Sequence, residues 1–295
     1  MGQGEQIGLS KPGVLLAIIA DDLTGALDAA APFAGRGLRV RVATRPGALG
    51  AALRGAEVVA VSTRSREVGP EEARAAVAAV LAALPDGVRL FKKVDSRLKG
   101  NIAAELAAFP EGPVLAVPAL PEFGRVVRDG AVCGFGVAVP VPVAAALGRA
   151  ALVPDVATGQ DMDRALAATP DALVVGARGA AAALARGMAG RAVTRTVPGL
   201  PMLVVVGSTD PITLAQVAAA RARPGVRYVA APDGHAGVFA APGVTLVQAV
   251  PGAGAGGQQV AAALAQTVAA AARGAASLVL TGGATAEAVL DVLDV

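Results

Sequence analysis

Residues 14–26 read VLLAIIADDLTGA, and this stretch decides the fold. The apolar run from Val14 to Ala20 is typical of a strand that is buried on both faces of a parallel sheet. A polar loop over Asp21–Gly25 comes next, and a helix is expected over Ala26–Gly35. A buried strand, a polar loop and a helix in this order predict the first βα unit of an α/β protein.

The same alternation of strands and helices continues outward from this stretch. We expect further strands at 38–43, 57–62, 88–94, 114–117 and 172–176, with helices at 70–84, 102–109, 162–168 and 180–188. Residues 118–154 are different, because they are rich in Gly, Pro and Val and lack a helical period. Irregular or antiparallel structure is predicted there, in the form of a flap over a site.

A second series of βα units follows the segment VPGLP at 197–201, which is typical of a linker. Its strands are expected at 202–206, 227–230, 244–250 and 277–280, and its helices end near 222 and 272. We therefore predict an α/β protein of two domains, residues 1–197 and 198–295. Each domain is expected to be a mainly parallel sheet flanked by helices.

Composition excludes several classes of protein. The 295 residues carry 26 basic and 23 acidic side chains, a net charge of +3 that is too small to indicate nucleic-acid binding. The single cysteine, Cys133, allows neither an intrachain disulfide nor a cysteine metal cluster. The uncharged segment Ala236–Ala272 is broken by Pro and Gly, so no membrane span and a soluble cytoplasmic protein are predicted. The sequence does not indicate an oligomeric state.

The first candidate site is Asp21 and Asp22, where the first strand gives way to a helix. Ligands of open α/β sheets bind at the carboxyl ends of strands. One aspartate could simply cap the helix, but two adjacent acids exceed what a cap needs. We therefore interpret the pair as functional.

The second candidate is the segment KKVDSRLKGN at 92–101, which also follows a strand and precedes a helix. Cations suit a carboxylate or a phosphate, and hydroxyl and amide groups suit sugar hydroxyls, so the segment fits a small anionic substrate. A solvated basic loop is the alternative. Gly124 and Arg125, after the strand at 114–117, would reach the same edge of the sheet, and Arg125 could bind a carboxylate.

The third candidate lies in the second domain. The turns GSTDPIT at 207–213 and TGGATA at 281–286 are rich in small and hydroxyl residues, and each leads into a helix. Backbone amides in such turns can hold phosphates, although no Walker A pattern occurs in the sequence. The segment GAGAGG at 252–257 also fits the spacing of a dinucleotide-binding loop. No acid follows the next strand to hold a ribose hydroxyl, so this interpretation is a lesser one.

Five ordered motifs resemble the four-carbon acid sugar kinase family over nearly the whole chain. They are ADDLTGA at 20–26, KVDSRLKGN at 93–101, PALPEFGR at 118–125, GSTDPITLAQ at 207–216 and TGGATA at 281–286. The resemblance implies an ATP-dependent transferase of carbohydrate metabolism that phosphorylates a hydroxyl of a four-carbon sugar acid of the threonate, erythronate or 3-oxo-tetronate type. ATP with Mg²⁺, and no dedicated metal site, are implied.

The resemblance also assigns roles to residues. Asp22, Asp21 and Lys93 would be catalytic, with Asp22 preferred as the acceptor of the substrate hydroxyl proton. The sugar acid would be bound by Asp95, Ser96, Lys99, Gly100, Asn101, Gly124 and Arg125 in the first domain. The nucleotide would be bound by Ser208, Gly282, Gly283, Ala284 and Thr285 in the second domain.

The sequence departs from the family pattern in three places. Arg97 and Lys99 stand where a threonine and an arginine are expected, so substrate preference could differ. Val126 and Val127 stand where a threonine is common. The sequence ends at Val295, whereas the family continues with another glycine-rich segment, so a short or C-terminally truncated member is expected. The alternatives are a sugar-acid-binding protein without ATP turnover and, less favoured, a nicotinamide-dependent oxidoreductase.

Overall fold

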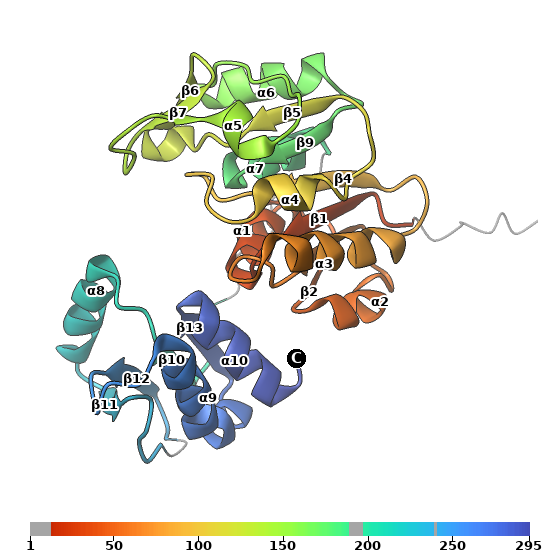
Figure 1. Ribbon diagram of the computed structural model, residues 1–295. Coiled ribbons are helices and arrows are strands. Elements are labelled where there is room, and N and C mark those ends of the chain that lie inside the picture. The colour runs from red at the N-terminus through yellow and green to blue at the C-terminus, as the bar shows by residue number, and fades with distance from the viewer. Residues whose placement is uncertain (1–12, 189–196, 239–240) are drawn as a thin grey trace, which may run out of the picture. The chain divides into compact units, whose positions relative to one another are not determined.

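The computed structural model describes residues 13–188, 197–238 and 241–295. The chain divides into two compact units, Met1–Val193 (the N-terminal unit) and Thr194–Val295 (the C-terminal unit), which are described separately. Each unit contains a parallel sheet flanked by helices (Figure 1), which confirms the predicted fold class. The functional roles assigned from the sequence to residues 1–197 and 198–295 stay predictions.

The sheet of the N-terminal unit has six parallel strands in the order β2-β3-β1-β4-β9-β5. The strands are β1 (Leu16–Ala20), β2 (Val40–Ala43), β3 (Val58–Ser62), β4 (Arg89–Lys93), β5 (Val114–Val117) and β9 (Leu173–Gly176). Every residue of β1, β3 and β5 is buried, as the continuous apolar runs predict. One feature was not predicted: β9 lies between β4 and β5, although both precede it in the chain.

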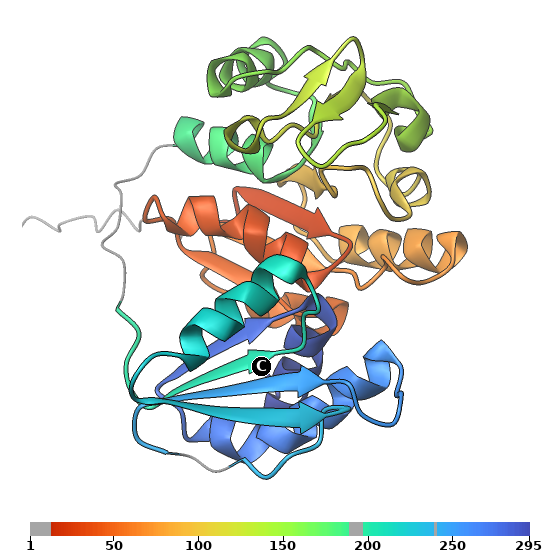
Figure 2. The ribbon, with the colours of Figure 1, turned by 90° about the vertical axis from the view of Figure 1, so that its left-hand side faces the viewer.

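Helices cover both faces of this sheet. They are α1 (Leu23–Ala34), α2 (Leu49–Ala52), α3 (Pro70–Ala82), α4 (Ile102–Leu106), α5 (Val143–Leu147), α6 (Gly159–Ala168) and α7 (Arg178–Gly187), with short 3₁₀ turns η1 (Pro46–Ala48) and η2 (Pro121–Phe123). α1 packs beside α7, and α3 packs beside α4. Figure 2 shows α1 and α3 on opposite sides of the strands.

The predicted flap region is antiparallel, as expected. It consists of β6 (Arg125–Arg128), β7 (Ala131–Gly134) and β8 (Val141–Pro142), which form a three-stranded sheet of their own. Helix α5 follows in a segment where the sequence showed no helical period. A turn of helix this short depends on packing, and its two buried residues, Val143 and Leu147, provide that packing.

The C-terminal unit has four parallel strands in the order β11-β12-β10-β13. Its elements are β10 (Met202–Val206), α8 (Pro211–Arg221), β11 (Val226–Pro232), β12 (Val244–Val250), α9 (Gly257–Arg273), β13 (Ser277–Thr281) and α10 (Gly283–Leu293). Alternate residues of β10 enter different cores: Leu203 and Val205 pack with α9 and α10, whereas Val206 packs with Val217 of α8.

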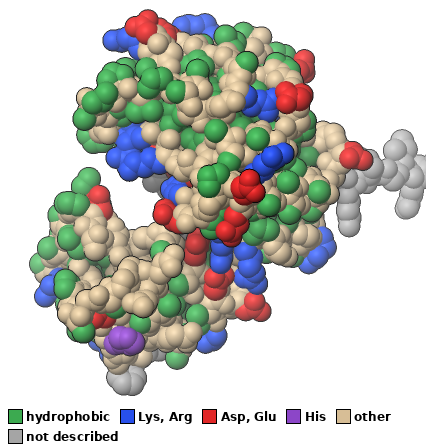
Figure 3. Space-filling view, viewed as in Figure 1, with side chains coloured by type: hydrophobic (Ala, Val, Ile, Leu, Met, Phe, Trp, Pro, Cys, Tyr) green, Lys and Arg blue, Asp and Glu red, His purple; other side chains and the backbone are tan. Residues whose placement is uncertain are grey.

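Within the described ranges, no helix has both the length and the apolar character needed to cross a bilayer. Acidic and basic side chains are interspersed on the face shown in Figure 3, and no continuous basic patch covers that face.

Candidate active site

The polar residues of the N-terminal unit gather where the strands end. A hollow of about 400 Å³ opens at the carboxyl edge of the sheet, beside the ends of β1, β4 and β9. It is lined by Asp22, Thr24, Gly25, Asp28, Arg66, Lys93, Asp95, Ser96, Leu120 and Ala177. The volume suits a small polar ligand, and carboxylates, cations and hydroxyl groups all reach it.

Asp22 has a structural role as well as a place in the hollow. Its Oδ1 accepts the backbone N–H of Gly25 at 2.6 Å, so Asp22 caps α1, and Oδ2 accepts the Thr24 hydroxyl at 2.9 Å. A Cβ on residue 25 would lie 2.6 Å from Asp22 Oδ1, which explains why a glycine is required there. Asp22 thus caps α1, and the functional role assigned to the pair stays a prediction.

Asp21 is clamped by an arginine that the sequence did not single out. Arg66 donates from Nε and Nη2 to the two carboxylate oxygens of Asp21, each at 2.8 Å, and its Nη1 lies 2.7 Å from Asp22 Oδ2. Burial alone would raise the pKa of Asp21. The hydrogen bonds from Arg66 and the charges of Lys92, Arg66 and Lys93 outweigh burial, so the pKa is lowered.

Lys93 reaches the same hollow from the last position of β4. Its side chain is almost fully buried, and burial lowers its pKa despite the nearby carboxylates of Asp28, Asp21 and Asp22. Asp28, on α1, has a raised pKa, because burial outweighs the attraction of Lys93 and Arg178. A carboxyl and an amine whose pKa values move toward each other in one hollow are typical of a functional site.

The antiparallel flap is fastened to this edge. Arg125 Nη1 donates to Ser96 Oγ at 2.6 Å, and Arg125 Nε donates to the carbonyl of Phe135 at 3.0 Å. Arg178 lies 2.6 Å from Glu122 and 3.4 Å from Asp28, so the turn after β5 is tied to α1. Arg125 and Ser96 are thus together, as the sequence predicted, although Arg125 now bonds protein groups.

The other residues of the second motif support the site instead of lining it. Asn101 donates from Nδ2 to the carbonyls of Ser65 and Val68 at 2.9 and 2.8 Å, so its amide holds a loop. Gly100 has φ +98°, and a Cβ there would lie 2.9 Å from Asp21 Oδ2. Lys99 is exposed and Gly124 forms a left-handed turn; neither lines the hollow.

Sequence reasoning missed Arg66 and Asp28. A signal for Arg66 existed, because the segment TRSR at 63–66 follows a buried strand at the same edge as the predicted motifs. Asp28 lies beyond the motif at 20–26, one turn further along α1, and nothing in the sequence marks it.

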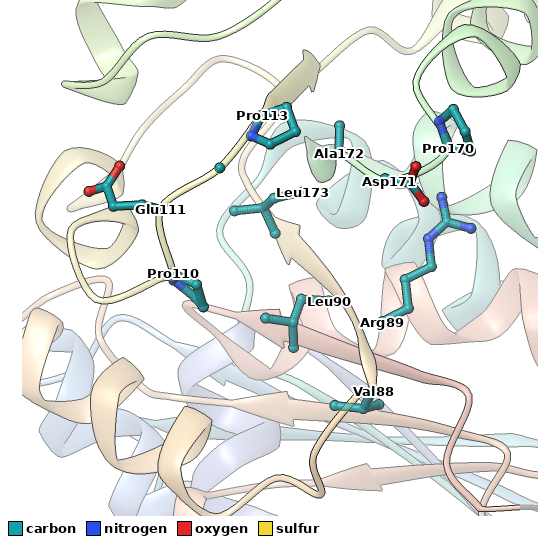
Figure 4. A pocket seen from close by; sticks show the side chains of 11 residues that line it. Val88, Arg89, Leu90, Pro110, Glu111, Pro113, Pro170, Asp171, Ala172 and Leu173 are labelled. Atoms are coloured by element: carbon teal, nitrogen blue, oxygen red, sulfur yellow. The ribbon is translucent and has the colours of Figure 1, made fainter.

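A second hollow, of about 450 Å³, lies at the opposite edge of the same sheet, near the starts of β4, β5 and β9 (Figure 4). Leu90, Leu173 and Pro110 occupy the middle of the view. Glu111 and Asp171 are exposed, and Glu111 pairs with Arg149 at 3.4 Å. This hollow lacks the buried charged groups of the first, so the candidate active site is placed at the carboxyl edge.

In the C-terminal unit, two turns meet where β10 and β13 end. A Cβ on Gly207 would lie 1.8 Å from Thr285 Oγ1, and a Cβ on Gly282, whose φ is +92°, would lie 3.2 Å from the backbone N of Ser208. Gly283, Ala284 and Thr285 form the first turn of α10. The hydroxyl of Thr281 is buried and has no hydrogen-bond partner in the described structure. The two turns therefore lie in close contact where β10 and β13 end, and their role as a phosphate cradle stays a prediction.

Backbone amides of the glycine-rich loop at 252–257 are hydrogen-bonded to a carboxylate of the same unit. The carboxylate of Asp233 accepts the backbone N–H groups of Ala253 and Gly254, and a Cβ on Gly252 would lie 2.6 Å from Asp233 Oδ2. These amides would have to hold the pyrophosphate of a dinucleotide. The geometry therefore gives no support to the nicotinamide alternative.

No group of three or more His, Cys, Asp and Glu side chains in the described ranges could hold a metal ion.

Comparisons with known proteins add independent information. Residues 16–145 match the family model described as a sugar-binding N-terminal domain. A D-threonate kinase of Cupriavidus necator is 43% identical over 119 residues, which are 38% of this chain and 28% of that protein. A D-erythronate kinase of Heliobacterium modesticaldum is 36% identical over 124 residues, again 38% of this chain and 28% of that protein. The chain thus matches less than a third of these curated relatives.

A solved structure extends the similarity to nearly the whole chain. It is a protein of Bordetella bronchiseptica described as a domain of unknown function, DUF1537, with bound citrate, in a domain-swapped dimer. The identity is 30% and the TM-score 0.52, and the match covers 95% of this chain and 86% of the other.

Proposed function

Because this chain belongs to the four-carbon acid sugar kinase family, the DUF1537 family of its solved relative, we propose that it phosphorylates a hydroxyl group of a four-carbon sugar acid with ATP. The substrate class is that of D-threonate and D-erythronate. The observation that carries the proposal is the hollow in which Arg66 and Lys93 face Asp22 and Asp28 at the carboxyl edge of the sheet.

The charges of this hollow suit a sugar acid. The substrate carboxylate would meet Arg66 or Lys93, since both cations line the wall. Lys93 is the better candidate, because the guanidinium of Arg66 already donates to both oxygens of Asp21 and pairs with Asp22. The Lys93 ammonium has three donors, of which one binds the carbonyl of Val94. The hydroxyl groups of the substrate would meet Ser96, Thr24 and Asp95. Leu120 and Ala177 would contact the carbon chain.

Asp22 is the proposed acceptor of the substrate hydroxyl proton. Asp21 is a poor base, since its pKa is lowered and its carboxylate does not line the hollow. Asp22 lines the hollow, and its side chain is 18% exposed, against 2% for Asp21. Lys93 would offset the negative charge that develops on the transferred group.

The C-terminal unit is proposed to hold the nucleotide. Ser208, Gly282 and the first turn of α10, with Gly283, Ala284 and Thr285, would bind its phosphates through backbone amides. Thr285 is buried against Gly207, so its side chain would support the turn and its amide would face the ligand. ATP supplies the phosphoryl group, and Mg²⁺ would arrive with it.

The second candidate is a sugar-acid-binding protein without phosphoryl transfer. It is favoured by one observation: every residue that lines the hollow belongs to the N-terminal unit, so binding needs no residue of the C-terminal unit.

One experiment separates the two candidates. The chain is titrated calorimetrically with D-threonate, D-erythronate and erythritol, an uncharged control, and ADP release is then measured with Mg-ATP and each compound. Binding of one acid but not of erythritol, with ADP release, supports the kinase. Binding without ADP release moves the assignment to the binding protein, and absence of binding contradicts both.

A further inference from the structure

Lys92 and Glu105 form an ion pair that is closed inside the N-terminal unit. Lys92 Nζ lies 2.7 Å from Glu105 Oε2, and the side chains are 0% and 1% exposed. Lys92 belongs to β4 and Glu105 to α4. Neither residue lines the hollow, so the proposed chemistry does not use them directly.

Stability alone is a weak reason for such a pair. The free energy needed to remove two charges from water often exceeds their mutual attraction, and apolar replacements of similar volume are often neutral or stabilising. Lys92 and Lys93 are adjacent in a strand, so their side chains point to opposite faces. Lys93 faces the hollow, so the Lys92 side chain points to the opposite face of the sheet.

The pair is linked to the hollow through Ser65. The second carboxylate oxygen of Glu105, Oε1, accepts the hydroxyl of Ser65. The backbone N–H of Ser65 in turn donates to the carbonyl of Asp21 at 2.9 Å. Ser65 directly precedes Arg66, so it stands between the buried pair and the residue that clamps both aspartates.

The same helix holds the loop at a second point. Asn101 is the N-cap residue of α4, and its amide binds the carbonyls of Ser65 and Val68. One short helix therefore fixes the loop around Arg66 through two side chains, Asn101 and Glu105. A carboxylate can accept the Ser65 hydroxyl while Lys92 compensates its charge, which an apolar pair could not do.

We infer that Lys92 and Glu105 are positioning residues, which hold Ser65 so that Arg66 meets Asp21 and Asp22 in the geometry that binds the sugar acid. The inference rests on the proposed function, in which Arg66 and Asp22 line the site that binds the substrate.

Two variants test it. Lys92→Met/Glu105→Leu replaces the pair by apolar side chains, and Ser65→Ala removes the link while both charges remain. For each variant, urea denaturation gives the stability, calorimetry gives the Kd of the acid bound by the wild type, and ADP release gives kcat and KM. Carboxyl-carbon NMR gives the pKa of Asp21 without any ligand.

We expect the double variant to be about as stable as the wild type, with sugar-acid affinity and kcat/KM reduced on the order of 10- to 100-fold. Ser65→Ala should lose affinity in the same direction. The pKa of Asp21 should rise in Ser65→Ala, which keeps the charge of Lys92, because Arg66 is no longer held against Asp21.

Wild-type affinity and wild-type kcat/KM in a folded double variant, or an unchanged pKa of Asp21 in Ser65→Ala, would overturn the inference. If the double variant does not fold, Ser65→Ala decides by the same three readouts. If the wild-type chain binds no sugar acid, the proposed function fails, and the pKa of Asp21 still decides: a rise in Ser65→Ala supports the positioning role, and no change refutes it.

Discussion

Replacing Arg66 by Met tests the electrostatic centre of the site. The substitution removes two hydrogen bonds of 2.8 Å to Asp21 and an ion pair of 2.7 Å with Asp22, and keeps much of the side-chain volume. Breaking a fully buried pair costs about 3–5 kcal/mol in free energy of unfolding. The Arg66 side chain is 27% exposed, and Lys92 and Lys93 still act on Asp21, so we take the lower end, about 3 kcal/mol. For a unit of this size, that loss lowers Tm by roughly 6–12 °C.

The effect should depend on pH with a defined sign. In the wild type the folded-state pKa of Asp21 is lowered, so its stabilisation is present above the unfolded pKa of about 3.8 and is lost as pH falls through the folded pKa. The difference in stability between the wild type and Arg66→Met should therefore be largest near neutral pH and shrink in acid. Urea denaturation at a series of pH values from about 7 to about 3 measures it.

Arg89→Met is the matched control. Arg89 is a half-buried arginine at the start of β4, and within the described part of the chain it makes no ion pair. The control should be destabilised by less than about 1 kcal/mol, with little dependence on pH. Equal losses for the two variants, or a loss for Arg66→Met that persists unchanged in acid, would refute the reasoning.

Three further predictions follow from the site. Asp22→Asn should lower kcat by orders of magnitude with little change in Tm, because asparagine caps a helix as well as aspartate. Asp22→Ala should in addition lower the free energy of unfolding, measured by urea denaturation, by about 1 kcal/mol. Near wild-type turnover of Asp22→Asn would remove the residue from the catalytic role. Gly207→Ala should abolish ATP binding in calorimetry, since its Cβ would lie 1.8 Å from Thr285 Oγ1. Adding Thr285→Ala to Gly207→Ala should restore part of the ATP affinity. Unchanged ATP affinity in Gly207→Ala alone would count against the phosphate cradle. Asp233→Ala should increase hydrogen exchange at Ala253 and Gly254, whose amides lose their acceptor, and unchanged exchange would contradict the bonds described for the loop.

The sequence predicted the location of the site better than its contacts. Apolar runs followed by charged residues placed Asp21, Lys93 and Ser96 at one edge of a parallel sheet, and the structure brings them together. The sequence alone does not show which of Arg64 and Arg66, two residues apart in one polar loop, contacts the aspartates. Arg64 has φ +52° and donates to the carbonyl of Thr44, so only Arg66 turns toward the aspartates.

The burial of Lys92 and the strand order also escaped prediction. The strand expected at 88–94 includes Lys92 and Lys93, but the sequence does not show that Lys92 is buried and pairs with Glu105 from a helix further along the chain. Such a partner is set by tertiary packing, which local patterns do not describe. The position of β9 is unpredictable for the same reason, since its apolar run would fit either edge of the sheet.

The late insertion of β9 has a consequence for how the N-terminal unit can be divided. The family model spans residues 16–145, yet β9 lies at 173–176 and is the strand that pairs with both β4 and β5. A fragment cut at the ends of that model would leave β4 with an unpaired edge and β5 with no strand beside it in the sheet. During synthesis on the ribosome, β9 is missing until residue 176 has emerged. Until then the edges of β4 and β5 that pair with β9 have no partner strand, so the six-stranded sheet can form only late in synthesis.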